Sequence, residues 1–151
     1  MPQGATPAGE AAFAPELYLG LRAPARIMSS RRHVTLLLVE DDELVRLTVA
    51  MTLEDLGFTV FEATTGEAAL QQLKTGLDTD ILVTDIDLGP GISGLQLADQ
   101  VRALRPGLPV VFVTGRVTTL QGRARREREV YLPKPFEGET LARVVHSLLP
   151  A

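Results

Sequence analysis

Short apolar runs alternate with amphipathic segments along most of this sequence, and this alternation constrains the fold more than any other feature. Short apolar runs bounded by turn residues predict buried strands, and segments with an apolar residue every three to four positions predict helices. The predicted strands are 34–39, 58–61, 81–84, 110–113 and 130–132, and the predicted helices include 43–56, 66–73, 93–104 and 137–149. With a fifth helix between the last two strands, this order predicts an α/β fold with a doubly wound five-stranded parallel sheet.

The helix predicted at 43–56 shows the helical period clearly. Leu44, Leu47 and Met51 stand at positions i, i+3 and i+7, which indicates one apolar face, and Gly57 ends the helix. Asp42 is best interpreted as its N-cap residue, because a carboxylate there accepts a hydrogen bond from a free backbone N–H.

Composition divides the chain near residue 30. The 151 residues are 45% apolar and 23% charged, which is typical of one globular domain. Residues 1–27 are rich in Ala, Pro and Gly and show no helical or strand period, so we expect 1–32 to be a disordered extension and 33–151 to form the domain. Met28 is a second candidate start codon, and the mass of the natively expressed protein would test that hypothesis.

Several kinds of chemistry are excluded by residues that the sequence lacks. There is no Cys, so disulfides, thiolate metal sites and thiol nucleophiles are ruled out. His33 and His146, the two histidines, stand in unlike contexts, which argues against a histidine metal site. A net charge of -4 argues against nucleic-acid binding, and no apolar run is long enough to span a membrane. The chemistry that remains is that of side chains with oxygen atoms.

Polar side chains follow the predicted strands at the point where each strand ends. Because ligands of such sheets bind beyond the carboxyl ends of the strands, we expect these side chains to meet in one crevice. A cluster of carboxylates needs a counter-charge, and oxygen ligands suit Mg²⁺. A carboxylate can also act as a nucleophile toward phosphorus. The residues concerned are Glu40, Asp41, Asp42, Asp85, Asp87, Thr114 and Lys134.

Four sequence segments resemble the signature segments of response-regulator receiver domains, the CheY-like domains of two-component systems. In chain order they are VEDDELVR at 39–46, LVTDIDLGPGISG at 82–94, VVFVTG at 110–115 and YLPKPF at 131–136. The resemblance covers about residues 34–149. It implies a flavodoxin-like fold with strand order 2-1-3-4-5.

The resemblance also implies a phosphoacceptor and a Mg²⁺ site. Asp85 would accept the phosphoryl group from a phosphohistidine of a partner kinase. Asp41 would bind Mg²⁺ directly together with Asp85, and Glu40 would act mostly through water. The backbone carbonyl of Asp87 would complete the protein's metal ligands.

Three further residues match the positions that respond to phosphorylation in this family. Thr114 and Lys134 would sense the phosphoryl group, and Tyr131 would rotate when the domain switches, although Tyr131 fits plain packing equally well. The family also implies a cis peptide bond at Lys134–Pro135. Asp87 and Arg116 would stand near the attacking water and set the lifetime of the acyl phosphate.

The sequence departs from the family pattern in two places. The stretch between Thr114 and Lys134 is shorter than usual and carries an arginine-rich segment, which we interpret as a solvated helix face. The sequence Gly89-Pro90-Gly91 indicates a longer, more flexible loop after the acceptor.

The function that these features predict is a stand-alone response regulator of the bacterial cytoplasm. Its partners would be a histidine kinase or a histidine phosphotransfer protein and a possible downstream protein target, with no nucleic acid and no membrane. It would be no enzyme beyond its own phosphorylation and dephosphorylation. The signal would leave by onward transfer or by a face formed by the helix after 114, the strand at 130–132 and the last helix.

Three other classes fit the sequence less well. A dinucleotide-binding fold would need a glycine-rich turn after the first strand, and VEDDELVR has none. A haloacid-dehalogenase-type phosphatase would also use Asp85, but it needs acidic metal ligands at later strand ends, and the sequence has none there. A pseudo-receiver that is not phosphorylated and acts as an interaction module is the main non-catalytic alternative. It would be expected to lack one of the acidic positions or the lysine, and all of them are present.

Overall fold

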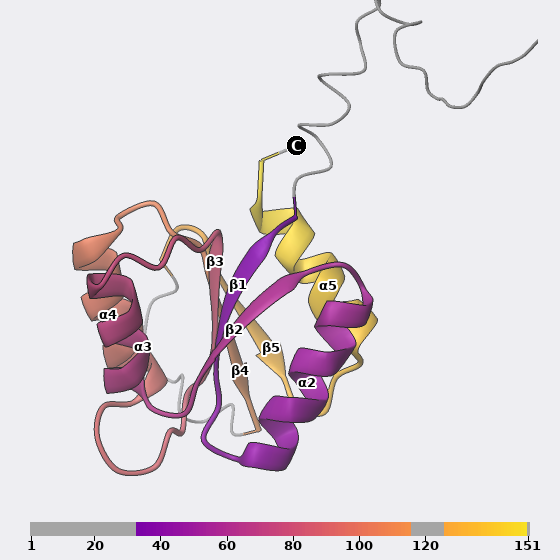
Figure 1. Ribbon diagram of the computed structural model, residues 1–151, viewed down its shortest axis with the longest axis horizontal. Helices are drawn as coiled ribbons and strands as arrows, with labels where there is room; N and C mark the ends of the chain where they lie inside the picture. The colour runs from indigo at the N-terminus through magenta and orange to yellow at the C-terminus, as the bar shows by residue number, and fades with distance from the viewer. Residues whose placement is uncertain (1–32, 116–125, 151) are drawn as a thin grey trace, which may run out of the picture. The chain divides into compact units, whose positions relative to one another are not determined.

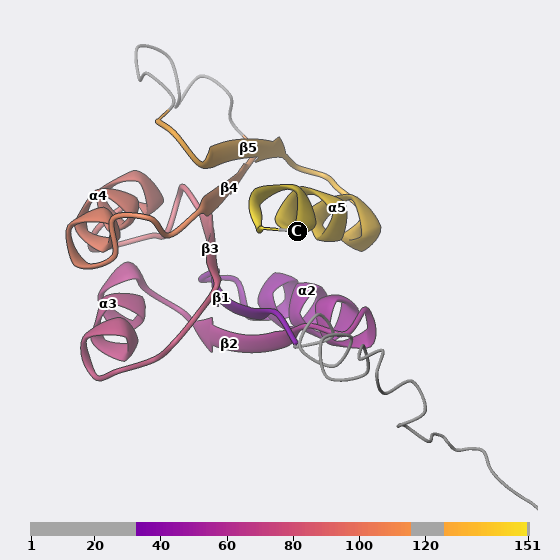
Figure 2. The same ribbon diagram turned by 90° about the horizontal axis from the view of Figure 1, so that it is seen from above.

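Five parallel strands form the centre of the structure, a computed structural model that describes residues 33–115 and 126–150. The strands pair in the order β2-β1-β3-β4-β5 (Figures 1 and 2). Their bounds are β1 (Thr35–Val39), β2 (Thr59–Ala63), β3 (Ile81–Asp85), β4 (Val110–Thr114) and β5 (Glu129–Pro133). The predicted sheet and strand order are therefore confirmed, and the ends of each predicted strand lie within one or two residues of the observed ends.

Helices cover both faces of the sheet. Figure 2 shows α3 (Gly66–Lys74) and α4 (Gly94–Leu104) on one face, and α2 (Glu43–Asp55) and α5 (Gly138–Leu148) on the other. The described residues thus contain four helices rather than five. The fifth was expected between β4 and β5, where residues 116–125, including Arg116, lie outside the described part. The predicted extension 1–32 also lies outside it.

The continuous apolar runs are explained by a sheet that is covered on both sides. Every residue of β3 and β4 is buried. Because side chains alternate across a strand, Leu37 and Leu82 pack under α3 and α4, whereas Leu36 and Val83 pack under α2 and α5. A strand that is buried on both faces has no polar side to alternate with.

The apolar residues that identify α2 as a helix are not the ones that face the core. Leu44, Leu47 and Met51 are 76%, 41% and 63% exposed, and the buried side chains of α2 are Ala50 and Leu53. The helix has apolar residues around most of its circumference, so its period identifies a helix without identifying the buried face.

The N-cap interpretation of Asp42 is confirmed. Its Oδ1 accepts a hydrogen bond from the backbone N–H of Val45 at 3.0 Å. Ser93 caps α4 in the same way, with Gln96 returning a hydrogen bond to the backbone of Ser93. Because these helices follow β1 and β3, their N-termini lie at the carboxyl edge of the sheet. None of the described helices has the length and apolarity needed to cross a membrane.

The interpretation of the arginine-rich segment as a helix face is wrong for its described part, which forms a turn before β5. Arg126 forms an ion pair with Asp99 of α4. Arg128 has a positive φ of 65°, and its guanidinium donates to the carbonyl oxygens of Gly107 and Leu148 at 3.1 and 2.9 Å. These arginines fasten the start of β5 to the neighbouring loop and helices.

Candidate functional site

Asp85 lies at the carboxyl end of β3 and is almost fully buried, with 6% of its surface exposed. Each of its side-chain oxygens has a partner. Oδ2 accepts a hydrogen bond from Nζ of Lys134 at 2.8 Å, and Oδ1 accepts one from the backbone N–H of Asp87 at 3.1 Å. The carboxylate is therefore held in one orientation at the sheet edge where the sequence predicts the acceptor.

Glu40 and Asp41 follow β1 and bring two more carboxylates to Asp85. One oxygen from each of the three carboxylates lies within 4.8 Å of the other two. Glu40 is buried and accepts hydrogen bonds from Nζ of Lys134 at 3.2 Å and from the backbone N–H of Asp42 at 3.0 Å. Asp41 is exposed. The structure thus brings together the three side chains that are predicted to hold a metal.

Thr114 and Lys134 close the site on the other side of Asp85. Thr114 ends β4 and directly follows Val113, which pairs with Asp85 across the sheet. The backbone N–H of Lys134 donates to the carbonyl oxygen of Thr114 at 2.8 Å. The peptide bond between Lys134 and Pro135 is cis, as the family resemblance implies. The predicted lysine is therefore the cation that joins Asp85 to Glu40.

Burial and neighbouring charges shift the protonation of Glu40 and Lys134. Burial raises the pKa of Glu40, the hydrogen bond from Asp42 works against that rise, and the charge of Asp85 adds to it. For Lys134, burial lowers the pKa, but the hydrogen bonds and charges of Asp85 and Glu40 outweigh burial, so the pKa is raised overall. The ammonium group of Lys134 therefore stays charged at neutral pH and offsets part of the negative charge of the cluster.

Glu40→Gln is expected to stabilise the Mg²⁺-free protein at neutral pH. Because folding raises the pKa of Glu40, protonation of this carboxyl group favours the folded state. The stability gained in this way is fully present below the ordinary pKa of 4.5 and is lost as the pH rises through the folded-state pKa. Glutamine imitates the protonated form, so its advantage should be present at neutral pH and should vanish in acid. Urea unfolding of both proteins across this pH range measures the difference. If Glu40→Gln is less stable than the wild type at neutral pH, the pKa of Glu40 is not raised by folding.

Tyr131, the predicted switch residue, is half-buried on β5. Its ring packs against Phe112 on β4, with the ring centroids 5.3 Å apart and the planes tilted by 31°. The two residues are direct partners in the β4–β5 pair. Packing of Tyr131 is thus observed, and its role as a switch stays a prediction.

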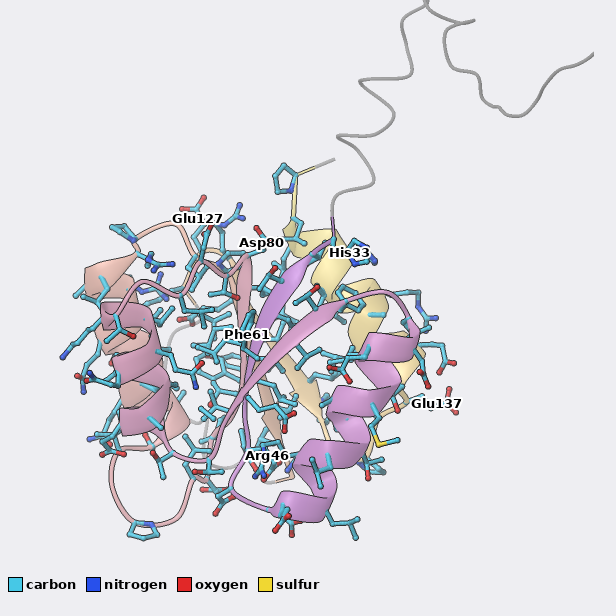
Figure 3. All side chains as sticks on the ribbon, in the orientation of Figure 1. His33, Arg46, Phe61, Asp80, Glu127 and Glu137 are labelled. Carbon is cyan, nitrogen blue, oxygen red and sulfur yellow. The ribbon has the colours of Figure 1, made fainter. Side chains whose placement is uncertain are left out.

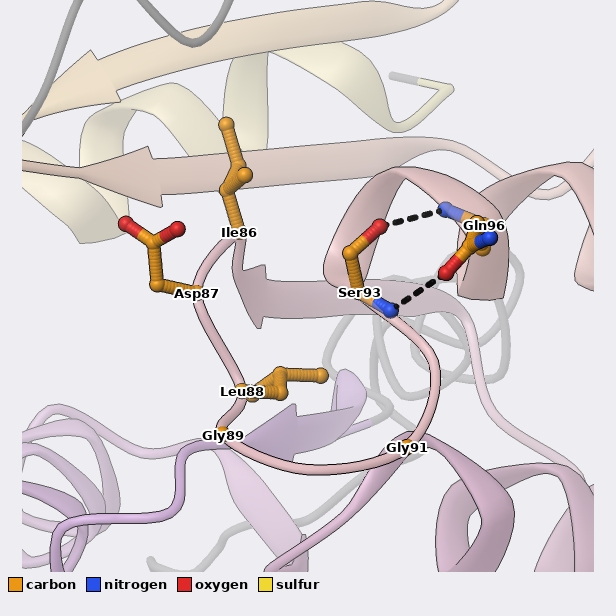
Figure 4. A pocket seen from close by; sticks show the side chains of 7 residues that line it. All are labelled: Ile86, Asp87, Leu88, Gly89, Gly91, Ser93 and Gln96. Atoms are coloured by element: carbon orange, nitrogen blue, oxygen red, sulfur yellow. Dashed lines mark hydrogen bonds between the residues drawn. The ribbon is translucent and has the colours of Figure 1, made fainter.

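The loop that follows Asp85 lines an open pocket of about 340 Å³ (Figure 4). Asp87 is exposed on this loop. The hydrogen bond from its backbone N–H to Asp85 keeps its backbone beside the acceptor, and its role as a carbonyl ligand stays a prediction. Ile86 and Leu88 are buried, and the backbone N–H of Gly94 donates to the carbonyl oxygen of Ile86 at 2.8 Å. The lining residues are Ile86, Asp87, Leu88, Gly89, Gly91, Ser93 and Gln96.

Arg46 supports the site and was missed by the sequence analysis. Its Nη1 donates to the carbonyl oxygen of Glu40 at 3.2 Å, and its Nε pairs with Glu62 at 3.0 Å. Figure 3 shows Arg46 near the start of α2, at the end of the sheet where β1 finishes. A cation near a helix N-terminus is unfavourable with respect to the helix dipole, so the position of Arg46 was the sequence signal that it has a role outside the helix.

Thr84 is a second supporting residue that the sequence analysis missed. It is fully buried, and its Oγ1 donates to the backbone carbonyl oxygen of Asp85 at 2.8 Å. A threonine inside an apolar strand carries no signal of this contact, because β-branched residues are common in strands for packing reasons.

The donor set of this site fits Mg²⁺. Hard divalent cations take oxygen ligands, and Glu40, Asp41 and Asp85 provide carboxylate oxygens within 4.8 Å of one another. The three carboxylates exceed the single charge of Lys134, so a divalent cation would balance the cluster.

Comparison with known proteins decides the family. A family model described as the response regulator receiver domain matches residues 36–146. The chain belongs to this receiver domain family. Receiver domains of two-component response regulators have a general phosphoryl-accepting role, and they generally bind Mg²⁺ at an acidic site.

The curated relatives are longer than this chain, which matches a part of each. The sequence is 34% identical over 118 residues to the sensor kinase CckA of Brucella abortus, which covers 76% of this chain and 12% of that kinase. It is 32% identical over 117 residues to the transcriptional regulatory protein CreB of Escherichia coli, which covers 76% of this chain and 50% of that protein. This receiver chain thus spans half or less of the length of these relatives.

Solved receiver structures have the same fold. A response regulator receiver protein from Sinorhizobium medicae is 32% identical with a TM-score of 0.72, covering 78% of this chain and 94% of that one. The chemotaxis response regulator CheY4 of Vibrio cholerae is 27% identical with a TM-score of 0.68, covering 78% of this chain and 100% of that one.

Proposed function

We propose that this receiver domain accepts a phosphoryl group on Asp85 from a phosphohistidine of a histidine kinase or a histidine phosphotransfer protein. The observation that carries the proposal is the arrangement of Asp85. It is a buried carboxylate within hydrogen-bonding distance of a lysine, and two further carboxylates lie within 4.8 Å of its oxygens. A phosphoryl acceptor needs this combination of a fixed oxygen nucleophile and concentrated charge neutralisation.

In the proposed transfer, a carboxylate oxygen of Asp85 forms a bond to phosphorus while the N–P bond of the donor breaks. The bonding electron pair remains on the imidazole nitrogen, which takes up a proton. Mg²⁺, held by Glu40, Asp41 and Asp85 with the carbonyl of Asp87, would neutralise charge on the phosphoryl oxygens. Lys134 would pair with a phosphoryl oxygen, which the 2.8 Å distance between its Nζ and Oδ2 of Asp85 supports.

The proposed output is a change in the surface around β5 and α5. Lys134 would exchange a contact with Asp85 for one with the phosphoryl group, and its backbone N–H is bonded to the carbonyl of Thr114. Tyr131 stands on the same strand, next to Phe112. A shift at Thr114 and Lys134 would therefore bias β5 between two arrangements. The signal would pass by contact with a protein target or by onward phosphotransfer. The interpretation as a stand-alone cytoplasmic regulator stays a prediction.

Intact mass after incubation with a small-molecule phosphodonor tests the proposed function. We expect a gain of one phosphoryl group in the presence of Mg²⁺ and no gain when the metal is chelated. Peptide mapping should place the group on the segment that contains Asp85. No gain in either buffer, together with no Mg²⁺ binding, would overturn the proposal and favour a pseudo-receiver that acts as an interaction module.

A further inference from the structure

The loop between Asp85 and α4 needs support from outside. Residues 87–93 pass around the pocket shown in Figure 4, and Gly89 and Gly91 line it. Gly89 and Gly91 have positive φ angles of 72° and 96°, a backbone conformation that side-chain-bearing residues rarely adopt. The buried Leu88 and the capped start of α4 hold the two ends, and the middle of the loop depends on other contacts.

Glu67 supplies such a contact for the middle of the loop. It stands in the first turn of α3, and its Oε2 accepts a hydrogen bond from the backbone N–H of Ile92 at 2.9 Å. A Cβ atom added to Gly91 would lie 2.8 Å from both carboxylate oxygens of Glu67. Glycine at position 91 therefore allows the carboxylate to lie directly against the backbone of the loop.

The other glycine of the loop lies against a predicted metal ligand. A Cβ atom added to Gly89 would lie 3.1 Å from Oδ2 of Asp41. Asp41 is otherwise exposed, so the loop bounds its carboxylate on one side only. The loop thus touches Glu67 at one position and Asp41 two residues earlier, and it also carries the backbone of Asp87.

We propose that Glu67 is a positioning residue for the Mg²⁺ site, acting through the loop that it anchors. This inference rests on the proposed function. The hydrogen bond to Ile92 holds the loop against Asp41 and keeps the backbone of Asp87 beside Asp85. Without that bond, the loop would sample positions in which Asp41 and Asp87 are misplaced for the metal. Outer residues that orient metal ligands affect metal affinity in this way.

Two substitutions separate positioning from charge. Glu67→Ala removes both the acceptor and the negative charge. Glu67→Gln removes the charge but keeps an oxygen that can accept from Ile92. If Glu67 acts by positioning, glutamine restores Mg²⁺ affinity. If it acts only by its charge, glutamine fails as alanine does. Glu139→Ala is a matched control, because Glu139 is also an exposed acidic residue in the first turn of a helix.

Calorimetric titration with Mg²⁺ and amide hydrogen exchange of Ile92 in the metal-free protein test the inference. For Glu67→Ala we expect Mg²⁺ affinity about fivefold weaker, as the loss of one hydrogen bond allows, and faster exchange at Ile92. Glu67→Gln and Glu139→Ala should remain within about twofold of the wild type.

Three results would overturn the inference. The first is equal Mg²⁺ affinity in the wild type and Glu67→Ala, and the second is equal exchange at Ile92 in the two proteins. The third is Glu67→Gln binding as weakly as Glu67→Ala. All three leave the proposed function intact when the wild type binds Mg²⁺. A wild type that binds no Mg²⁺ would overturn the proposed function as well.

Discussion

Asp85→Asn is expected to abolish phosphoryl uptake, with a loss of at least about a thousandfold in the rate of labelling. Asparagine has nearly the same shape as aspartate, so its Oδ1 can still accept the hydrogen bond from Asp87. Its amide oxygen is a poor nucleophile, however, and cannot form an acyl phosphate. The change therefore removes the chemistry with little change in packing. Intact mass after incubation with a phosphodonor and Mg²⁺ measures the result.

Asp78→Asn is a matched control for this experiment. Asp78 is an exposed aspartate in the loop before β3, and the substitution is chemically identical. We expect this variant to be labelled at the wild-type rate. If Asp85→Asn still gains one phosphoryl group, the acceptor lies elsewhere, and peptide mapping would show whether Asp41 or Asp87 takes its place.

The sheet and the site could be predicted from sequence for one shared physical reason. A strand between two helix layers is buried on both faces, so β3 and β4 begin as short apolar runs, and the polar residues that follow each run lie at the edge of the sheet. Asp85 and Thr114 stand at these transitions, and the parallel pairing brings them together.

Contacts that join segments far apart in the sequence could not be predicted in this way. Period alone identified α2 as a helix, but Ala50 and Leu53 are buried rather than Met51, because the sheet and α5 together decide which face is covered. Likewise, Gly89-Pro90-Gly91 indicates a flexible loop from its composition. Its contact with Glu67, which lies 25 positions from Ile92, becomes visible only when α3 and the loop lie side by side.

The close approach of α4 to the end of β3 predicts a large effect for Gly94→Ala. A Cβ atom at position 94 would lie 2.1 Å from the carbonyl oxygen of Asp85 and 2.9 Å from Cα of Ile86. Both are backbone atoms, so no side-chain rotation can relieve the clash, and either α4 or the backbone that carries the acceptor must move. We expect a loss of about 3 kcal/mol in the free energy of unfolding, at the upper end of overpacking effects.

Gly138→Ala provides a comparison at the same distance but against a different neighbour. The added Cβ atom would lie 2.1 Å from Cγ2 of Thr52, a side-chain methyl group that can move. Movement of Thr52 would break the hydrogen bond from its Oγ1 to the carbonyl oxygen of Thr48. We therefore expect a loss of about 1 kcal/mol in the free energy of unfolding. Gly107→Ala meets no atom within 4 Å and sets the baseline.

Thermal and urea unfolding of the three variants rank these costs. The expected order of destabilisation is Gly94→Ala, then Gly138→Ala, then Gly107→Ala. In Gly94→Ala, phosphoryl uptake should also fall at temperatures where the protein remains folded, because relief of the clash displaces Asp85. Normal uptake in a destabilised Gly94→Ala protein would show that α4 moves and the acceptor does not. A stability equal to that of Gly107→Ala would contradict the close approach itself, since a backbone contact of this kind leaves no cheaper way to accommodate a methyl group.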